Sequence, residues 1–187
     1  MHQTVKNLIL IKKELELISN KLPSIIAVSK TFPISNIFPL IEYGHVNFGE
    51  NKVQEALEKW KNIKGQFSQI KLHMLGKLQT NKVKFALPLF DYIHSLDSKK
   101  LADKISHYQK DQNIQTKIFI QVNIGKESQK SGIQENEIHD FYNYCKSLNL
   151  NILGLMCIPP FDQDSTDYFI KMKNLNNKIG LKELSMG

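Results

Sequence analysis

The stretch Ile25-Ile-Ala-Val-Ser-Lys-Thr31 decides the fold of this 187-residue chain. Its first four residues are apolar, and such a short, nearly continuous apolar run is typical of a parallel strand buried on both faces. The polar group Ser29-Lys30-Thr31 follows directly. Upstream, apolar residues recur every three to four positions from Leu8 to Leu22, which predicts an amphipathic helix ended by Pro23. This change of period predicts an α/β fold.

The same alternation continues to the end of the chain. We expect strands at Ile25–Val28, Val46–Phe48, Leu72–Leu75, Tyr92–Leu96, Lys117–Asn123, Ile152–Ile158 and Leu184–Met186, with helices at Ile34–Tyr43, Lys52–Trp60, Asn81–Leu87, Ser98–Gln109, Ile138–Leu148 and Ser165–Lys178. Strands that alternate with helices imply a parallel sheet, either doubly wound or closed as a (β/α)8 barrel. Polar residues gather at the predicted strand ends, which meet at one mouth in a barrel, so we expect an incomplete TIM barrel of seven strands.

Composition limits the class of protein. The chain has 41% hydrophobic and 23% charged residues, which is the balance of a soluble globular protein. Its apolar runs are all shorter than the ~20 residues needed to cross a bilayer, and the N-terminus lacks the pattern of a signal peptide. We therefore expect a single domain over residues 1–187, located in the cytoplasm. Two cysteines, Cys145 and Cys157, are too few for a disulfide framework and are expected to be buried.

The charge of the chain points to anionic ligands without naming one. The formal net charge is +7, and all 25 basic residues are lysines. Without arginine, bidentate recognition of guanine edges is not possible, so we expect no nucleic-acid partner. The six histidines show no spacing typical of metal ligands, and we expect no metal site.

Lys30 is the first candidate for chemistry, because it ends the first predicted strand. Next to apolar Val28, an inward-pointing ammonium would be partly desolvated, and a desolvated lysine is a good nucleophile toward carbonyl compounds. A lone lysine after a strand is more often an ordinary surface residue. Position alone therefore leaves both interpretations open.

Five separated segments add a family resemblance. They are Ala27–Thr31, Phe48–Asn51 with Val53–Glu55, His73–Lys82, Lys130–Gly132 and Gly154–Met156. In order and spacing they closely resemble the pyridoxal phosphate homeostasis protein family, and Leu184–Gly187 resembles the start of that family's seventh-strand motif. The resemblance implies a barrel like the N-terminal domain of bacterial alanine racemase, with pyridoxal 5′-phosphate (PLP) as the cofactor.

The resemblance also assigns roles to residues. Lys30 would hold PLP as a Schiff base. Asn51 would lie near the cofactor ring, or cap the following helix, and His73 would be either a cofactor contact or a structural histidine with satisfied hydrogen bonds. Lys130 would stabilise the phosphate or transiently accept PLP. Ser185 would remain from the phosphate-binding cup.

The chain departs from the family pattern at its C-terminal end. That pattern continues beyond Gly187 into a helix and an eighth strand whose arginine faces the pyridine nitrogen. We expect a shortened chain with two unpaired sheet edges, with ligand affinity and stability below those of the family and melting below ~65 °C.

Two functions are weighed. The first is a monomeric PLP carrier that buffers the cofactor and delivers it to apo-enzymes, with no membrane partner and no turnover of its own. The alternative is a PLP-dependent amino-acid racemase, which needs a second acid–base group on the opposite face of the substrate. Racemases of this fold take that group from another domain, so the carrier is preferred.

Overall fold

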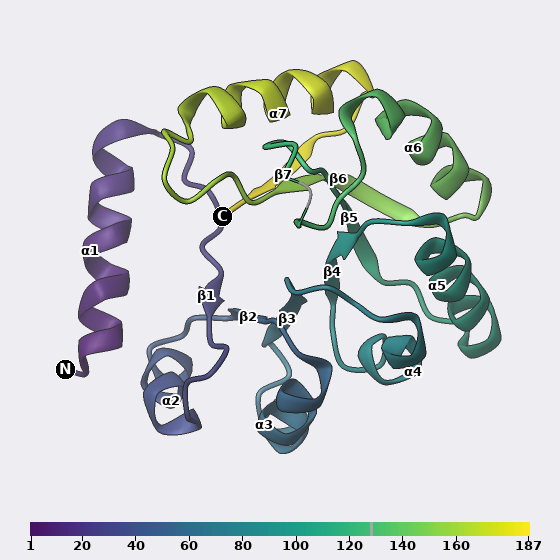
Figure 1. Ribbon diagram of the computed structural model, residues 1–187. Helices are drawn as coiled ribbons and strands as arrows, with labels where there is room; N and C mark the ends of the chain where they lie inside the picture. Colours follow the sequence, from purple (N-terminus) through teal and green to yellow (C-terminus); the bar gives the residue numbers. More distant parts are fainter. Residues whose placement is uncertain (128) are drawn as a thin grey trace.

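The structure, a computed structural model, describes residues 1–127 and 129–187. Seven strands of this part form one parallel sheet in which neighbours in sequence are neighbours in space, in the order β1-β2-β3-β4-β5-β6-β7. The strands are β1 (Ala27–Val28), β2 (Asn47–Glu50), β3 (Lys71–Met74), β4 (Tyr92–Leu96), β5 (Lys117–Gln121), β6 (Asn151–Cys157) and β7 (Glu183–Met186). In Figure 1 they follow an arc around an inner face, with β1 and β7 at its two ends.

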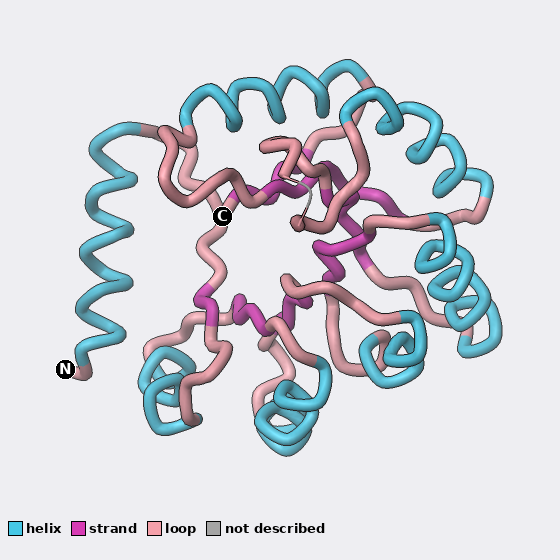
Figure 2. Tube along the Cα trace, in the orientation of Figure 1, coloured by secondary structure: helices cyan, strands magenta, loops and turns pink. Residues whose placement is uncertain are grey.

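Helices cover the outside of this arc (Figure 2). They are α1 (Gln3–Ile18), α2 (Ile34–Glu42), α3 (Val53–Gln66), α4 (Val83–Ala86), α5 (Lys99–Gln112), α6 (Ile138–Ser147) and α7 (Thr166–Lys178), and the 3₁₀ turns η1 (Thr80–Lys82) and η2 (Glu135–Glu137) precede α4 and α6. Within the described residues, none of these helices is long and apolar enough to cross a membrane. The curved parallel sheet with helices on its outside confirms the predicted barrel, which is open and incomplete.

Several element boundaries differ from the sequence prediction, and two helices show why. The first helix ends at Ile18 instead of Leu22, because only Val5 and Leu8 are buried and the apolar residues of its last turns find no packing surface. Ser19 then forms a local turn in which its hydroxyl donates to the Lys21 carbonyl and accepts from the Lys21 N–H. The helix expected over Asn81–Leu87 is split into η1 and the short α4.

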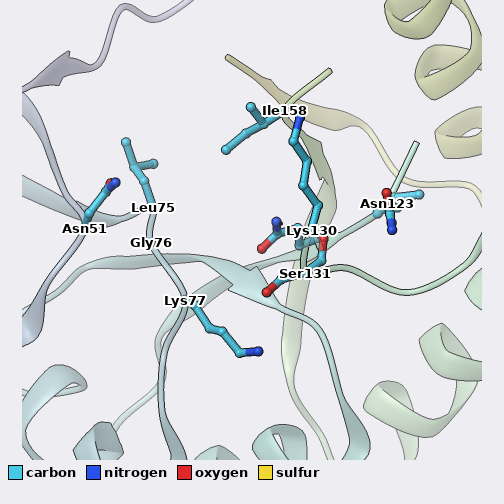
Figure 3. A pocket seen from close by; sticks show the side chains of 10 residues that line it. Asn51, Leu75, Gly76, Lys77, Asn123, Lys130, Ser131 and Ile158 are labelled. Carbon is cyan, nitrogen blue, oxygen red and sulfur yellow. Dashed lines mark hydrogen bonds between the residues drawn. The ribbon is translucent and has the colours of Figure 1, made fainter. Parts of the chain in front are cut away.

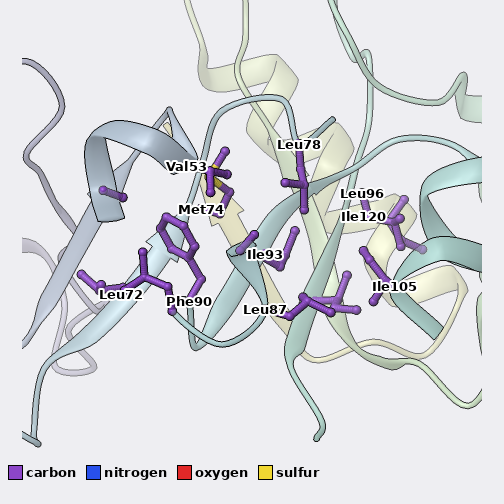
Figure 4. Close-up of a cluster of buried hydrophobic side chains, with 14 of the residues drawn as sticks. Val53, Leu72, Met74, Leu78, Leu87, Phe90, Ile93, Leu96, Ile105 and Ile120 are labelled. Atoms are coloured by element: carbon purple, nitrogen blue, oxygen red, sulfur yellow. The ribbon is translucent and has the colours of Figure 1, made fainter. Parts of the chain in front are cut away.

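The main core lies between the sheet and its helices. Alternate strand residues such as Leu72 and Met74, together with Ile93, are almost completely buried there, in the same apolar cluster as Ile105 of α5 (Figure 4). Side chains of a strand point alternately to the two faces of its sheet, so one set of residues fills this core. Burial of each large apolar side chain stabilises the fold by about 1.5–3 kcal/mol.

The other set of residues faces the inside of the arc. His73, Tyr92, His94 and Phe119 form ring contacts there, and Ser185 of β7 contacts the same group. Polar side chains therefore occupy an interior that closed barrels commonly fill with branched aliphatic residues.

Candidate functional site

A pocket of about 220 Å³ opens at the carboxyl ends of several strands (Figure 3). This is the end at which barrel enzymes carry their active sites. Its lining comes from the segments after β2 and β3, the end of β5 and the loop after it, and the end of β6: Asn51, Leu75, Gly76, Lys77, Gln121, Val122, Asn123, Lys130, Ser131 and Ile158. Two of the predicted site residues, Asn51 and Lys130, are thus brought together.

Lys130 is fixed at the pocket wall by its own loop. Its ammonium forms an ion pair with Glu127 at 2.8 Å and donates a hydrogen bond to the carbonyl of Pro159 at 3.2 Å. The loop is closed further by Asn123, whose side-chain amide donates to the Glu127 carbonyl and accepts from the Glu127 N–H. The loops after β5 and β6 therefore hold one cation at the mouth.

Asn51 lies where the strands leave the sheet, directly after β2. A Cβ on Gly76 would lie 2.3 Å from the Asn51 carbonyl oxygen, so glycine is required for the two segments to come this close. The alternative role as a helix cap is wrong, because the N-cap residue of α3 is Lys52.

Lys77 is a pocket residue that the sequence reasoning did not single out. It follows β3 and lines the pocket together with Lys130, so two lysines contribute to one cavity. The sequence offered one indication, because Lys77 is the first basic residue after a predicted strand. Active-site residues of barrel enzymes come from the segments that follow the strands.

Lys30 lies at the end of β1, outside the lining of this pocket. Ser29 continues the parallel pairing, since its N–H donates to the Gly49 carbonyl at 2.8 Å. The expected partial desolvation of Lys30 is wrong, because its side chain is exposed. In the described part of the chain β1 is paired only with β2, and nearby Val28 is also 46% exposed.

His73 and Ser185 belong to a hydrogen-bonded row on the inner face. His73 Nδ1 lies 2.9 Å from His94 Nε2, and His73 Nε2 lies 3.2 Å from Asn47 Oδ1. The row ends at Ser185, whose Oγ lies 2.7 Å from His94 Nδ1. With one proton on each ring, Ser185 donates to His94, His94 to His73, and His73 to Asn47.

Burial keeps both rings of this row neutral. Desolvation lowers the pKa of His73 to about 4 and that of His94 to about 3. The rings stack on Tyr92 at 4.3 Å and on Phe119 at 4.5 Å. Both nitrogens of His73 are engaged within the protein, so it can act on a ligand only through its neighbours. His94 was missed by the sequence reasoning, although its place inside a predicted strand next to that of His73 was a usable signal.

The residues present suit a small anionic aldehyde such as PLP. Primary amines stand at the mouth on Lys30, Lys77 and Lys130, and Asn51 and Ser131 add amide and hydroxyl groups. No aspartate or glutamate is among the residues that line this pocket, and the nearby Glu127 is paired with Lys130. A primary amine suits the aldehyde of PLP, and hydrogen-bond donors of this kind suit its phosphate.

Comparison with known sequences agrees with this geometry. The family described as "Alanine racemase, N-terminal domain" matches residues 7–179. The pyridoxal phosphate homeostasis protein of Aquifex aeolicus is 36% identical over 173 residues, which cover 87% of this chain and 75% of that protein. The protein of the same name from Pasteurella multocida is 40% identical over 163 residues, or 83% of this chain and 68% of that protein.

Solved structures show the same fold. PipY of Synechococcus elongatus, solved with PLP bound, has a TM-score of 0.81 and 31% identity, covering 94% of this chain and 87% of that one. An alanine racemase of Clostridium difficile has a TM-score of 0.73 at 15% identity, with 97% of this chain on 50% of that one, which shows the fold alone. The open sheet, the polar mouth and these matches together place the chain in the pyridoxal phosphate homeostasis protein family.

Proposed function

We propose that this chain binds PLP through Lys30 and serves in PLP homeostasis. The observation that carries the proposal is a lysine at the end of β1, exposed at the same end of the sheet as a pocket lined by lysine, amide and hydroxyl groups. The relatives that bear the homeostasis name, and PipY with PLP bound, support it.

Each predicted site residue has a place in this proposal. PLP supplies an aldehyde that condenses with a primary amine and releases water, and Lys30 would provide that amine. Asn51 and Lys130 would contact the ligand from the pocket side. Ser185 would have to turn its hydroxyl proton from His94 to the ligand in order to donate to a phosphate oxygen. His73 would act indirectly, by holding His94 in the tautomer that accepts from Ser185.

Exposure of Lys30 suits a carrier better than an enzyme. A linkage at the surface can be reached by water or by an apo-enzyme, whereas enzymes exclude water from the reacting group. We propose that the chain delivers PLP to apo-enzymes and acts as a monomer. A cytoplasmic location is also proposed, supported by two cysteines that remain free and buried.

The test is the absorption spectrum of the purified chain with added PLP, before and after borohydride reduction, followed by peptide mapping. We expect a visible band that saturates with PLP and a reduced adduct on Lys30. Lys30→Ala should abolish that adduct, while Lys126→Ala, on the loop after β5 and outside the pocket lining, should leave it in place. An adduct that forms only at other lysines, or turnover of amino acids with exchange of the α-hydrogen, would contradict the carrier proposal.

A further inference from the structure

The backbone on both sides of Lys30 is held by three charged residues. We call Glu50, Glu55 and Lys59 the Lys59 cluster. The carbonyl of Ser29 accepts from Lys59 Nζ at 2.7 Å, and the Ser29 hydroxyl donates to Glu50 Oε1 at 2.7 Å. On the other side, the N–H of Thr31 donates to Glu55 Oε1 at 2.6 Å. The residues before and after Lys30 are therefore both bonded to this cluster.

The cluster behaves as one unit because its members bond to one another. Lys59 Nζ lies 2.9 Å from Glu50 Oε1 and 3.3 Å from Glu55 Oε1. Glu50 is completely buried, and the indole N–H of Trp60 donates to the same oxygen at 3.0 Å. A buried carboxylate needs a cation beside it. Glu50 therefore fixes Lys59, and Lys59 in turn fixes the Ser29 carbonyl.

Thr31 shows why such a hold is needed. Its φ of 63° lies in the left-handed region, which a β-branched residue rarely adopts. A conformation of this kind persists only where surrounding contacts impose it, and the bond from its N–H to Glu55 is such a contact. The same bond is the main reason why the pKa of Glu55 is lowered, so the carboxylate stays ionised.

Lys30 follows Ser29 in a turn. The N–H of Phe32 donates to the Ser29 carbonyl at 3.3 Å, so the carbonyl that accepts from Lys59 also closes this turn. The turn comes directly after β1 and places Lys30 at the carboxyl end of the sheet, where the mouth opens.

We propose that Glu55 and Lys59 are positioning residues for Lys30: they fix the backbone from Ser29 to Thr31 so that the Lys30 amine is presented at the barrel mouth. The inference rests on the proposed function, in which that amine condenses with PLP. It adds a role for helix α3, which contributes no side chain to the pocket described above.

Four variants of α3 test the proposal. Glu55→Ala removes the acceptor, and Glu55→Asp keeps the charge near Lys59 but is one methylene too short to reach Thr31. Glu55→Gln restores a neutral acceptor. Glu58→Ala is the matched control, because Glu58 is exposed on the same helix and accepts only from Gln54 within the described residues.

Two readouts are needed: hydrogen exchange at the Thr31 amide without PLP, and the Kd for PLP from the absorption titration. We expect exchange at Thr31 to rise at least fivefold and Kd to rise about tenfold in Glu55→Ala and Glu55→Asp. Both quantities should stay within twofold of the unmodified chain in Glu55→Gln and Glu58→Ala. If Glu55→Ala does not fold, the unmodified chain is compared with Glu55→Asp alone.

The outcomes separate this inference from the proposed function. If the unmodified chain forms the adduct on Lys30 and Glu55→Asp binds PLP equally well, the positioning role is overturned while the proposed function stands. If the unmodified chain forms no adduct on Lys30, the proposed function fails and the positioning role fails with it, whatever happens to exchange at Thr31.

Discussion

At the scale of single residues, His73 and His94 matter because they stay neutral in the pH range in which most histidines take up a proton. His94 is 1% exposed and His73 5% exposed, and each gives both ring nitrogens to a hydrogen bond. A proton added to His94 would reverse its bond with the Ser185 hydroxyl, and one added to His73 would set two donors against each other. Stability at acid pH should therefore depend on these two side chains.

The sign of this dependence follows from the pKa values. Burial places the pKa of His73 at about 4 and that of His94 at about 3, below 6.5, so the unfolded chain takes up protons first as the pH falls. Their contribution is complete above about pH 6.5 and is lost as the pH falls toward 4 and 3. At pH 5 the free energy of unfolding should have dropped by ~2 kcal/mol for each histidine relative to pH 7.5.

Urea unfolding at pH 5 and pH 7.5 measures this loss. His94→Gln should remove a clear part of the pH-dependent difference, because glutamine does not titrate, while His73 and His45, whose pKa burial also lowers, still contribute. His139→Gln, at an exposed position on α6, should leave the difference unchanged. An equal pH dependence in the chain and in His94→Gln would refute the assignment.

The two cysteines provide a second prediction at this scale. Burial raises the pKa of Cys145 to about 12 and that of Cys157 to about 11, so almost no thiolate is present at pH 8. We expect neither thiol to react with Ellman's reagent within minutes at pH 8, and both to react at once in guanidinium chloride. Rapid release of one equivalent of thionitrobenzoate from the folded chain would contradict this.

At the scale of elements, the pairing of β6 with β7 depends on a glycine. A Cβ on Gly154 would lie 1.7 Å from the carbonyl oxygen of Glu183, which is backbone and has no flexible side chain to move away. Gly154 is directly opposite Glu183 in the register. The close approach brings β7 into place, and with it the contact between Ser185 and His94.

We therefore expect Gly154→Ala to push β7 away from β6. The free energy of unfolding should fall by about 3 kcal/mol or more, as for severe overpacking, and amides of β7 should lose protection from hydrogen exchange. Gly65→Ala is the control. Gly65 lies in α3, and a Cβ added to it would meet no atom within 4 Å. That substitution should stabilise the chain by about 0.5–1 kcal/mol, and a similar loss in both variants would argue against the close contact.

At the scale of the whole molecule, the sheet has two ends. In the part of the chain that the structure describes, β1 pairs only with β2 and β7 only with β6. Val28 and Met186 are 46% and 44% exposed at these ends, while Ile93 and Ile120 in the middle are fully buried. Local stability should follow this gradient, because end strands have hydrogen-bonded neighbours on one side only.

Hydrogen exchange followed along the chain tests the gradient. Amides of β3, β4 and β5 should exchange only through global unfolding, with protection close to the full stability, whereas those of β1 and β7 should exchange at least tenfold faster by local opening. Protection that is uniform over all seven strands would show that the ends are covered in solution. Light scattering at the same concentrations would then tell whether a second copy covers them.

The amino-acid sequence by itself determined the α/β class, the seven strands and the candidate residues at the strand ends. It could do so because a buried parallel strand such as Ile25–Val28 needs a local apolar run, and local runs are visible in sequence. The family segments around Lys30 and Lys130 are likewise short and contiguous.

Only the tertiary structure decided which of these residues meet. Lys130 and Asn51 share a pocket with Lys77, whereas Lys30 stands outside its lining and is exposed. The row from Ser185 to His73 joins β7 to β4 and β3 across the inner face. The physical reason is that contacts across a curved sheet depend on register, twist and strand position, which are set by the packing of all the elements together.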